Sequence, residues 1–471
     1  MVRRLVAGVD TSTQSCKVRV TDAETGDLVR FGQAKHPNGT SINPACWWNA
    51  FQEAAQHAGG LDDVAALAVG GQQHGMVVLD KHGNVIRDAM LWNDVNSAPQ
   101  AAALIEKMGA APARNGEPED TTTRGKQRWV KTVGSSPVAS YTLTKVAWVA
   151  ENEPENAKKI AAICLPHDWL SWRIAGYGPV AEDEDAHLKA LFTDRSDASG
   201  TIYYDAASNE YHRDLIAMVL EAAEGAETAE AHADAIMLPT VLGPHQAASV
   251  KADPAIAGKD VEGGCILAPG GGDNAMASLG LGMSVGDVFV SLGTSGVAAA
   301  ISEKPTYDLA GAVSGFADCT GHYLPLACTI NGSRIIDAGR AALGVDYDEL
   351  AKLAFASKPG ADGITLVPYF NGERTPNRPD ATATLSGLTL ANTTRENLAR
   401  AFVEGLLCSQ RDCLEIIRSL GAQIKRILLI GGGAKSEAIR TLAPSIFGMD
   451  VTRPVTDEYV AIGAARQAAW V

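Results

Sequence analysis

The sequence predicts an α/β protein built from two related halves. Short apolar runs that end in glycine or hydroxyl residues alternate with helix-like segments along the 471 residues. Residues 5–20 read as a strand, a hydroxyl-rich tip and a second strand, and the same plan returns at 288–301. A plan that occurs once in each half indicates a duplicated domain. The length also suggests two or more domains with separate cores.

The composition excludes several classes of partner. A net charge of −15 argues against nucleic acid and against an anionic membrane, because both need a basic surface. The eight cysteines include no CxxC pair, which argues against metal clusters and disulfide frameworks. We find no signal peptide and no run of 18 apolar residues. We therefore expect a cytoplasmic protein that binds small molecules, and the sequence leaves a homodimer open.

The first strand leads into Asp10 and the hydroxyl residues Thr11, Ser12 and Thr13. Backbone amides and hydroxyls at such a tip can hold an anion, and an aspartate there can hold a hydrated metal ion. The alternative is a turn in which Asp10 only satisfies local amides.

A second polar group follows the predicted helix 45–58 and strand 64–69. Gln73 and His74 lie between two apolar strands and are flanked by glycines, which suits hydrogen bonding to a polyhydroxylated ligand. The alternative is that His74 satisfies a turn carbonyl. Trp92 stands beside an amide and an acid, a pairing that suits the wall of a sugar pocket, although a core position is also open.

The middle of the chain carries fewer signals. Residues 112–141 are polar and basic, which favours a solvated surface excursion. Residues 206–258 are rich in alanine and glutamate and contain several prolines. We place the domain boundary near 240–255, which gives domains 1–245 and 246–471.

The most informative stretch is 266–275. An apolar strand is stopped by the glycines 270–272, and Asp273 then precedes a helix-like run. This places a carboxylate at the carboxyl end of a strand, where it can accept a proton from a bound hydroxyl. The alternative is that Asp273 only caps its helix.

The second half repeats the pattern. Strand 288–292 ends in Gly293, Thr294 and Ser295, and a long amphipathic helix covers 395–420. Strand 427–430 leads into the glycine run 431–433, where a flat base or ribose can lie on exposed backbone. A final helix is expected at 459–470.

These segments, in this order, resemble the FGGY family of carbohydrate kinases over nearly the whole chain. The resemblance rests on Gly71-Gln72-Gln73-His74-Gly75, Leu91-Trp92-Asn93-Asp94, Gly270-Gly271-Gly272-Asp273-Asn274, Ser291-Leu292-Gly293-Thr294-Ser295-Gly296, Gly372-Glu373-Arg374-Thr375-Pro376 and Gly431-Gly432-Gly433-Ala434. It implies two duplicated ribonuclease-H-like domains of the actin-like ATPase type with an interdomain cleft. It also implies ATP-dependent phosphorylation of a sugar, with D-xylulose favoured by the Gln-Gln-His-Gly stretch.

The resemblance assigns roles to matching positions. Asp273 is the expected catalytic base, and Asp10 and Asp273 are expected beside Mg²⁺. The expected sugar contacts are Gln73, His74, Trp92, Asp273 and Asn274. The expected ATP contacts are Thr11, Ser12 and Thr13 in the first phosphate loop, Gly293, Thr294 and Ser295 in the second, and Gly432, Gly433 and Ala434 at the adenosine.

One departure from the family stands out. The family has glycine two residues after the first acid, whereas this chain has Ser12. Ser12 carries a Cβ where the family has none, so we expect the close approach of a phosphate to be altered. Three other readings stay open: a kinase for ribulose, gluconate or glycerol, an actin-like ATPase without a sugar substrate, and a binding protein that has lost catalysis.

Overall fold

The computed structural model describes residues 4–455 and 458–471. The chain divides into two compact units. Unit 1 contains the described residues up to Gly282, together with Phe316–His322 and Glu458–Val471, and unit 2 contains Met283–Gly315 and the described part of 323–457. This division differs from the expected boundary at 245/246 and leaves Asp273 in unit 1. The cause is strand pairing, because residues after 265 add strands to the first sheet.

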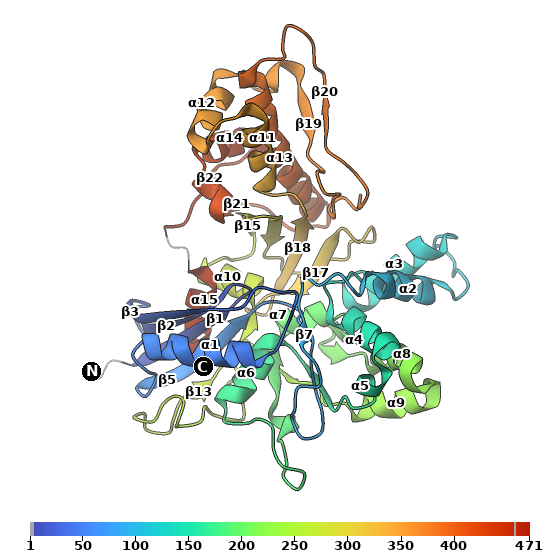
Figure 1. The fold of residues 1–471 in the computed structure, drawn as a ribbon, viewed down its shortest axis with the longest axis vertical. Coiled ribbons are helices and arrows are strands. Elements are labelled where there is room, and N and C mark those ends of the chain that lie inside the picture. The colour runs from blue at the N-terminus through green and yellow to red at the C-terminus, as the bar shows by residue number, and fades with distance from the viewer. Residues whose placement is uncertain (1–3, 456–457) are drawn as a thin grey trace. The chain divides into compact units, whose positions relative to one another are not determined.

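Unit 1 is organised around one mixed sheet (Figure 1). Its strands are β1 (Leu5–Thr11), β2 (Ser15–Asp22), β3 (Leu28–Lys35), β5 (Val64–Gly71), β13 (Ile266–Leu267) and β14 (Gly271–Gly272). The order is β13-β5-β1-β2-β3, and β14 pairs with β5. β1, β2 and β3 are antiparallel neighbours, whereas β5 runs parallel to β1 and to both later strands.

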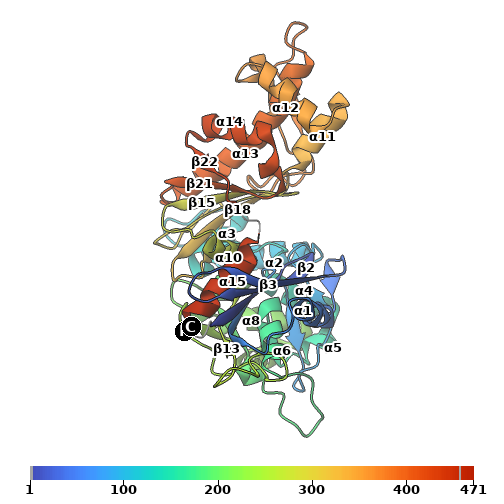
Figure 2. The same ribbon diagram turned by 90° about the vertical axis from the view of Figure 1, so that its left-hand side faces the viewer.

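Helices cover both faces of this sheet. α1 (Ala45–His57) packs on β2 and β3, and α15 (Tyr459–Trp470) packs on β1 and β5 beside α10 (Asp273–Gly280) (Figure 2). Glycine allows the close approach on both faces. A Cβ on Gly8 would lie 2.0 Å from the Ala461 carbonyl oxygen, and one on Gly32 would lie 2.0 Å from that of Ala54.

The expected helices at 45–58 and 459–470 are therefore confirmed, but the expected surface excursion at 112–141 is wrong in part. Helix α3 (Thr121–Val133) lies within it and buries Trp129, Val130 and Val133. The other helices of unit 1 are α2 (Ala98–Gly109), α4 (Thr142–Asn152), α5 (Pro154–Ala157), α6 (Pro166–Ile174), α7 (Arg195–Ala198), α8 (Arg213–Glu224) and α9 (Ala226–Ala235). Its short strand pairs are β4 (Ser41–Ile42) with β7 (Ala89–Met90), β6 (Val77–Leu79) with β8 (Ala162–Cys164), β9 (Phe192–Asp194) with β12 (Thr240–Leu242), and β10 (Tyr204–Asp205) with β11 (Glu210–Tyr211).

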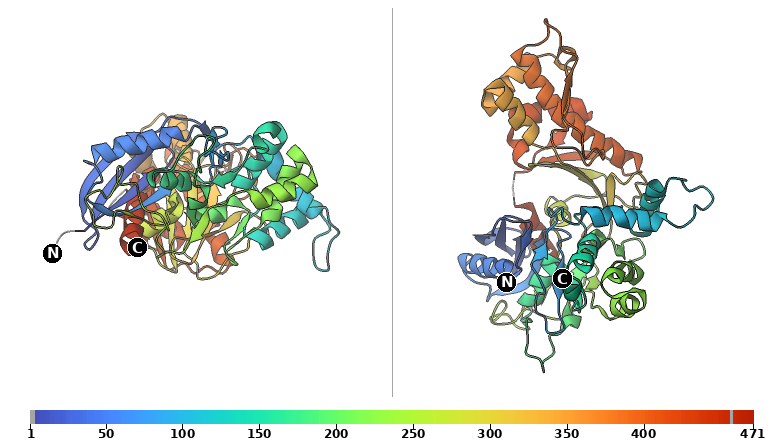
Figure 3. Two further views of the ribbon diagram at one scale, coloured as in Figure 1. Left: turned by 90° about the horizontal axis from the view of Figure 1, so that it is seen from below. Right: turned by 45° about the vertical axis from the view of Figure 1, so that its right-hand side comes forward.

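Unit 2 has a second mixed sheet of order β17-β18-β16-β15-β21-β22. These strands are β15 (Asp287–Leu292), β16 (Gly296–Ala300), β17 (Val313–Ala317), β18 (Tyr323–Thr329), β21 (Arg426–Ile430) and β22 (Val451–Thr452). The long helix α13 (Arg395–Ser419) packs on β16 and β18. Around it lie α11 (Arg334–Leu343), α12 (Tyr347–Ala356) and α14 (Glu437–Phe447), and a hairpin of β19 (Thr365–Val367) and β20 (Thr384–Ser386) completes the unit (Figure 3).

The two sheets share one topology, which confirms the expected duplication. In each, three antiparallel strands are followed by a strand parallel to the first and then by another parallel strand. The series β3-β2-β1-β5-β13 in unit 1 corresponds to β18-β16-β15-β21-β22 in unit 2. This supports the fold class expected from the sequence, two related α/β domains of the ribonuclease-H-like type.

All eight cysteines lie in the described part of the chain and none forms a disulfide. Across residues 4–455 and 458–471, no helix combines the length and the apolar character that crossing a bilayer requires.

Candidate active site

Three predicted site segments follow neighbouring parallel strands of unit 1. β5 lies between β1 and β14, with Gly70 opposite Asp10 on one side and Gly271 on the other. Parallel neighbours end at the same edge of a sheet, so Asp10, the segment after Gly71 and Asp273 share the carboxyl edge. Strands are spaced about 4.8 Å apart, which puts the backbones at Asp10 and Gly271 roughly 9–10 Å apart.

Asp273 begins α10, but its side chain does not cap the helix. Gly272 occupies the N-cap position and no side-chain capping bond is present. The Asp273 Oδ1 atom instead accepts a hydrogen bond of 2.9 Å from the side-chain amide of Asn274. The same amide donates to Gln73 Oε1 at 2.6 Å. The capping alternative is therefore wrong, and Asp273, Asn274 and Gln73 form one hydrogen-bonded group.

The electrostatic setting suits a proton acceptor. Burial, together with repulsion from Asp10, raises the pKa of Asp273 to about 7. A carboxylate whose pKa lies near neutrality can accept a proton from a hydroxyl and release it again at cellular pH.

The first loop is tied to Asp10. Ser12 donates to Asp10 Oδ1 from its backbone amide at 3.1 Å and also from its hydroxyl. Lys17 lies opposite Asp10 on β2, with its Nζ atom 3.4 Å from Asp10 Oδ2 and 3.0 Å from Glu458 Oε2. Ser12, where the resemblance leads us to expect a glycine, thus binds the acid through its side chain, an interaction that glycine cannot make. The Thr11 hydroxyl is buried without a hydrogen-bond partner among the described residues.

Trp92 joins the two predicted regions of unit 1. Its indole Nε1 donates to the hydroxyl of Thr13 at 3.0 Å, so its polar edge holds the first loop. The ring is half-buried, which leaves part of it accessible to a ligand.

We expect Trp92→Phe to lower kcat/KM for ATP about threefold to tenfold, because one hydrogen bond is worth about 0.5–1.5 kcal/mol. Phenylalanine keeps the aromatic surface but removes the donor. Steady-state kinetics with ATP varied at saturating sugar measures the effect. An unchanged value would mean that the indole nitrogen does not hold Thr13 in solution.

His74 is held tightly from several sides. It is a non-glycine residue with φ of 61°, its amide donates to Asp197 Oδ1 at 3.1 Å, and its carbonyl accepts from the Thr142 hydroxyl at 3.1 Å. The rings of Tyr141 and Phe316 lie 5.4 and 5.0 Å from its own.

Behind His74 lies a buried group that the sequence did not reveal, formed by His167, Asp168, Asp194 and Asp197. His167 Nε2 is 3.2 Å from Asp168 Oδ1 and 3.4 Å from Asp197 Oδ2. The only sequence signal was an acid and a histidine beside apolar residues at 163–170 and a turn at 196–201.

The predicted nucleotide segments lie together in unit 2. β15 and β21 are parallel neighbours, with Ser291 opposite Ile430, so the loops that follow them share one edge. Gly431 lies so close to Leu292 that a Cβ on Gly431 would be 2.9 Å from backbone atoms of Leu292. The first of these loops is fixed by the start of α11, because the amides of Gly332 and Ser333 donate to the carbonyls of Thr294 and Gly293 at 3.0 and 2.8 Å.

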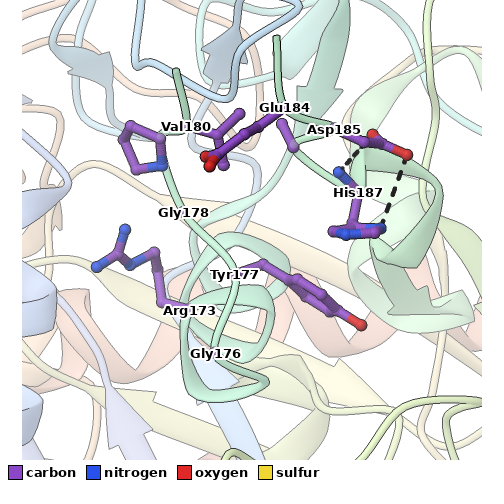
Figure 4. A pocket seen from close by; sticks show the side chains of 10 residues that line it. Arg173, Gly176, Tyr177, Gly178, Val180, Glu184, Asp185 and His187 are labelled. Atoms are coloured by element: carbon purple, nitrogen blue, oxygen red, sulfur yellow. Dashed lines mark hydrogen bonds and ion pairs between the residues drawn. The ribbon is translucent and has the colours of Figure 1, made fainter. Parts of the chain in front are cut away.

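A surface hollow lies apart from these residues. It has a volume of 680 Å³, is lined by residues between Arg173 and His187, and contains none of the predicted site residues (Figure 4). Within the described chain, no three His, Cys, Asp or Glu side chains gather as a metal site.

Comparison with known proteins places this geometry in context. The protein named xylulose kinase from Streptomyces coelicolor is 40% identical over 99% of this chain and 87% of its own. The one from Haemophilus influenzae is 32% identical over 98% of this chain and 90% of its own. The crystal structure of xylulose kinase from Bifidobacterium adolescentis superposes with a TM-score of 0.98 and 88% identity, covering 100% of this chain and 93% of that one.

Both units match one family. Residues 5–280 match the N-terminal domain of the FGGY family of carbohydrate kinases, and residues 288–471 match its C-terminal domain. The chain belongs to the FGGY family of carbohydrate kinases.

Proposed function

We propose that this protein transfers the terminal phosphoryl group of ATP to D-xylulose and forms D-xylulose 5-phosphate. Membership of the family supports sugar phosphorylation, and the relatives named xylulose kinase support the sugar. The observation that carries the proposal is the state of the Asp273 carboxylate. It does not cap its helix, its pKa is raised to about 7, and it accepts a hydrogen bond from the side-chain amide of Asn274.

In this proposal Asp273 orients the attacking hydroxyl and takes its proton. Gln73, His74, Trp92 and Asn274 bind the remaining hydroxyls and carbonyl of the sugar. Thr11, Ser12 and Thr13 bind phosphate in unit 1, and Gly293, Thr294 and Ser295 bind it in unit 2. Gly432, Gly433 and Ala434 carry the adenosine. Such a reaction depends mainly on positioning and charge neutralisation.

Mg²⁺ fits the acids present. Proteins usually hold this ion through one or two carboxylates, with phosphates and water as the other ligands. Asp10 and Asp273 supply two carboxylates whose mutual repulsion contributes to the raised pKa of Asp273. When bound with ATP, the ion would neutralise phosphate charge. The chain's own part is to hold Asp10 in place through Ser12 and Lys17.

A panel of sugars tests the substrate. We expect kcat/KM for D-xylulose to exceed that for ribulose, gluconate and glycerol by at least about a hundredfold, because several hydroxyl contacts of about 1 kcal/mol each act together. A coupled assay of ADP formation measures this, with ATP alone as the blank. A higher value for another sugar would assign the enzyme to that sugar. ADP formation that is indifferent to every sugar would favour an actin-like ATPase.

A further inference from the structure

His74 is the proposed sugar contact with the most elaborate support. Only 5% of the residue is exposed, so a ligand can reach no more than one edge of the ring. Gly200 packs against the edge that carries Nδ1 and Cε1, since a Cβ on Gly200 would lie 1.6 and 2.0 Å from these atoms. Gly200 therefore closes the Nδ1 side of the ring to a ligand.

Asp197 holds His74 through one of its two oxygens. Oδ1 accepts the His74 backbone amide at 3.1 Å and lies 3.4 Å from the ring nitrogen Nδ1. The ring contact is longer than an ordinary hydrogen bond, so Asp197 holds His74 mainly through the bond to its backbone amide. The aspartate is 0% exposed, and both contacts therefore act without competition from water.

The second oxygen of Asp197 points to another imidazole. Oδ2 is 3.4 Å from Nε2 of His167, which is itself 0% exposed and lies 3.2 Å from Asp168 Oδ1. Among the described residues, no lysine or arginine pairs with Asp168, Asp194 or Asp197. Buried carboxyl groups without a cation retain protons, because the charged form is poorly solvated.

The protonation states agree with this geometry. Burial lowers the pKa of His167 to about 3, so its ring is neutral and can accept a hydrogen bond. Burial, with repulsion from Asp168, raises the pKa of Asp197 well above its usual range. A protonated Asp197 still accepts the His74 amide at Oδ1, while Oδ2 lies 3.4 Å from the neutral His167 ring without a hydrogen bond.

We propose that Asp197, packed against His167, is a positioning residue that holds His74 in the orientation in which its ring contacts the sugar. This inference rests on the proposed sugar kinase function. Further hydrogen bonds within unit 1 hold Asp197 and its neighbour Ser196 in place. The amide of Asp197 is held by Asp194 at 3.0 Å, and the hydroxyl of Ser196, beside it, accepts from the amide of Gly272 at 3.2 Å.

Two substitutions of Asp197 separate positioning from bulk structure. In Asp197→Asn, the side-chain oxygen can still accept the His74 backbone amide, so we expect KM for xylulose to stay within about threefold of wild type. Asp197→Ala removes both contacts, and we expect KM for xylulose to rise about tenfold or more, with KM for ATP within twofold. Sugar binding measured by calorimetry should weaken in parallel.

A double-mutant cycle with His74→Ala decides whether Asp197 acts through His74. If it does, Asp197→Ala adds no further loss in the His74→Ala background, whereas a purely structural role gives additive losses. Asp308→Ala is the matched control, because Asp308 is also a buried aspartate but accepts from the backbone amides of residues 310, 312 and 313. We expect it to lower Tm without changing KM for xylulose.

The outcomes are distinct. Additive losses overturn the role of Asp197, and so does an Asn variant with KM for xylulose raised more than tenfold. If Asp197→Ala does not fold, the Asn variant decides the question alone. The wild-type enzyme, assayed alongside, tests the proposed function separately. If the wild type phosphorylates another sugar and not xylulose, the proposed substrate is wrong, and the mutant cycle is then repeated with that other sugar.

Discussion

Replacing Asp273 by alanine is expected to reduce sugar phosphorylation at least a hundredfold while the protein remains folded. A general base typically contributes about 10²–10⁴ in rate, and no other carboxylate in the Gln73–Asn274 group can take its place. The measurement is kcat for xylulose at saturating ATP, with folding followed by circular dichroism. Turnover above about a tenth of wild type would contradict the base role.

Asp273→Asn supplies the matched control, because it keeps the shape of the side chain and removes only its charge. The raised pKa of Asp273, about 7 against an ordinary 3.8, determines how both the stability and the activity of the protein should change with pH. As pH rises from about 4 to 7, the unfolded chain releases this proton before the native protein does, so the native protein loses stability over that window. Asp273→Asn should therefore have a higher Tm than wild type at pH 8 and an equal Tm near pH 4. In wild type, kcat/KM for the sugar should fall about tenfold per pH unit below pH 7.

The sequence predicted those parts of the site that follow directly from a strand. Asp10, Gln73, Asp273, Gly293 and Gly432 each come just after an apolar run, and strand direction alone places such residues at the carboxyl edge of a sheet. Glycine and hydroxyl residues mark these positions locally. Their places at the ends of strands could be predicted without tertiary information, and their roles stay predictions.

The parts that the sequence missed depend on contacts between distant segments. The unit boundary was misplaced because β13 and β14 join the first sheet by pairing with β5, about 200 positions earlier in the chain. The basic stretch 112–141 contains a helix because Arg124 is buried and donates to the backbone carbonyls of Gly109, Pro118 and Glu119. A charge pattern cannot distinguish such an arginine from one that faces solvent.

Asp197 and His167 were missed for a related reason. Asp197 lies in a segment that reads as a turn, and His167 lies at the start of α6. Each has an ordinary local role in the sequence. The role proposed for them depends on the packing of α6 and α7 beside His74, which brings Asp197 within 3.4 Å of both the His74 and the His167 rings.

The second large effect is expected from Gly332→Ala. A Cβ on Gly332 would lie 2.5 Å from the carbonyl carbon of Ser295 and 2.6 Å from the carbonyl oxygen of Gly293. These are backbone atoms, so no flexible side chain can move aside and the loop 293–295 must shift. We expect KM for ATP to rise at least tenfold and kcat to fall, because phosphate contacts tolerate only small displacements. ATP titrations in the coupled assay measure both values.

Two comparisons make this result specific to the nucleotide loop. Xylulose binding, measured by calorimetry without ATP, should stay within twofold of wild type, because the proposed sugar contacts all lie in unit 1. Gly344→Ala controls for a general loss of stability: Gly344 has φ of 64° at the end of α11, and a Cβ there would meet no atom within 4 Å. This control should cost about 1 kcal/mol of stability through backbone strain alone and leave KM for ATP unchanged. If Gly332→Ala also left KM for ATP within twofold, the loop at 293–295 would not be a phosphate site, and the nucleotide would have to be held by other residues of the chain.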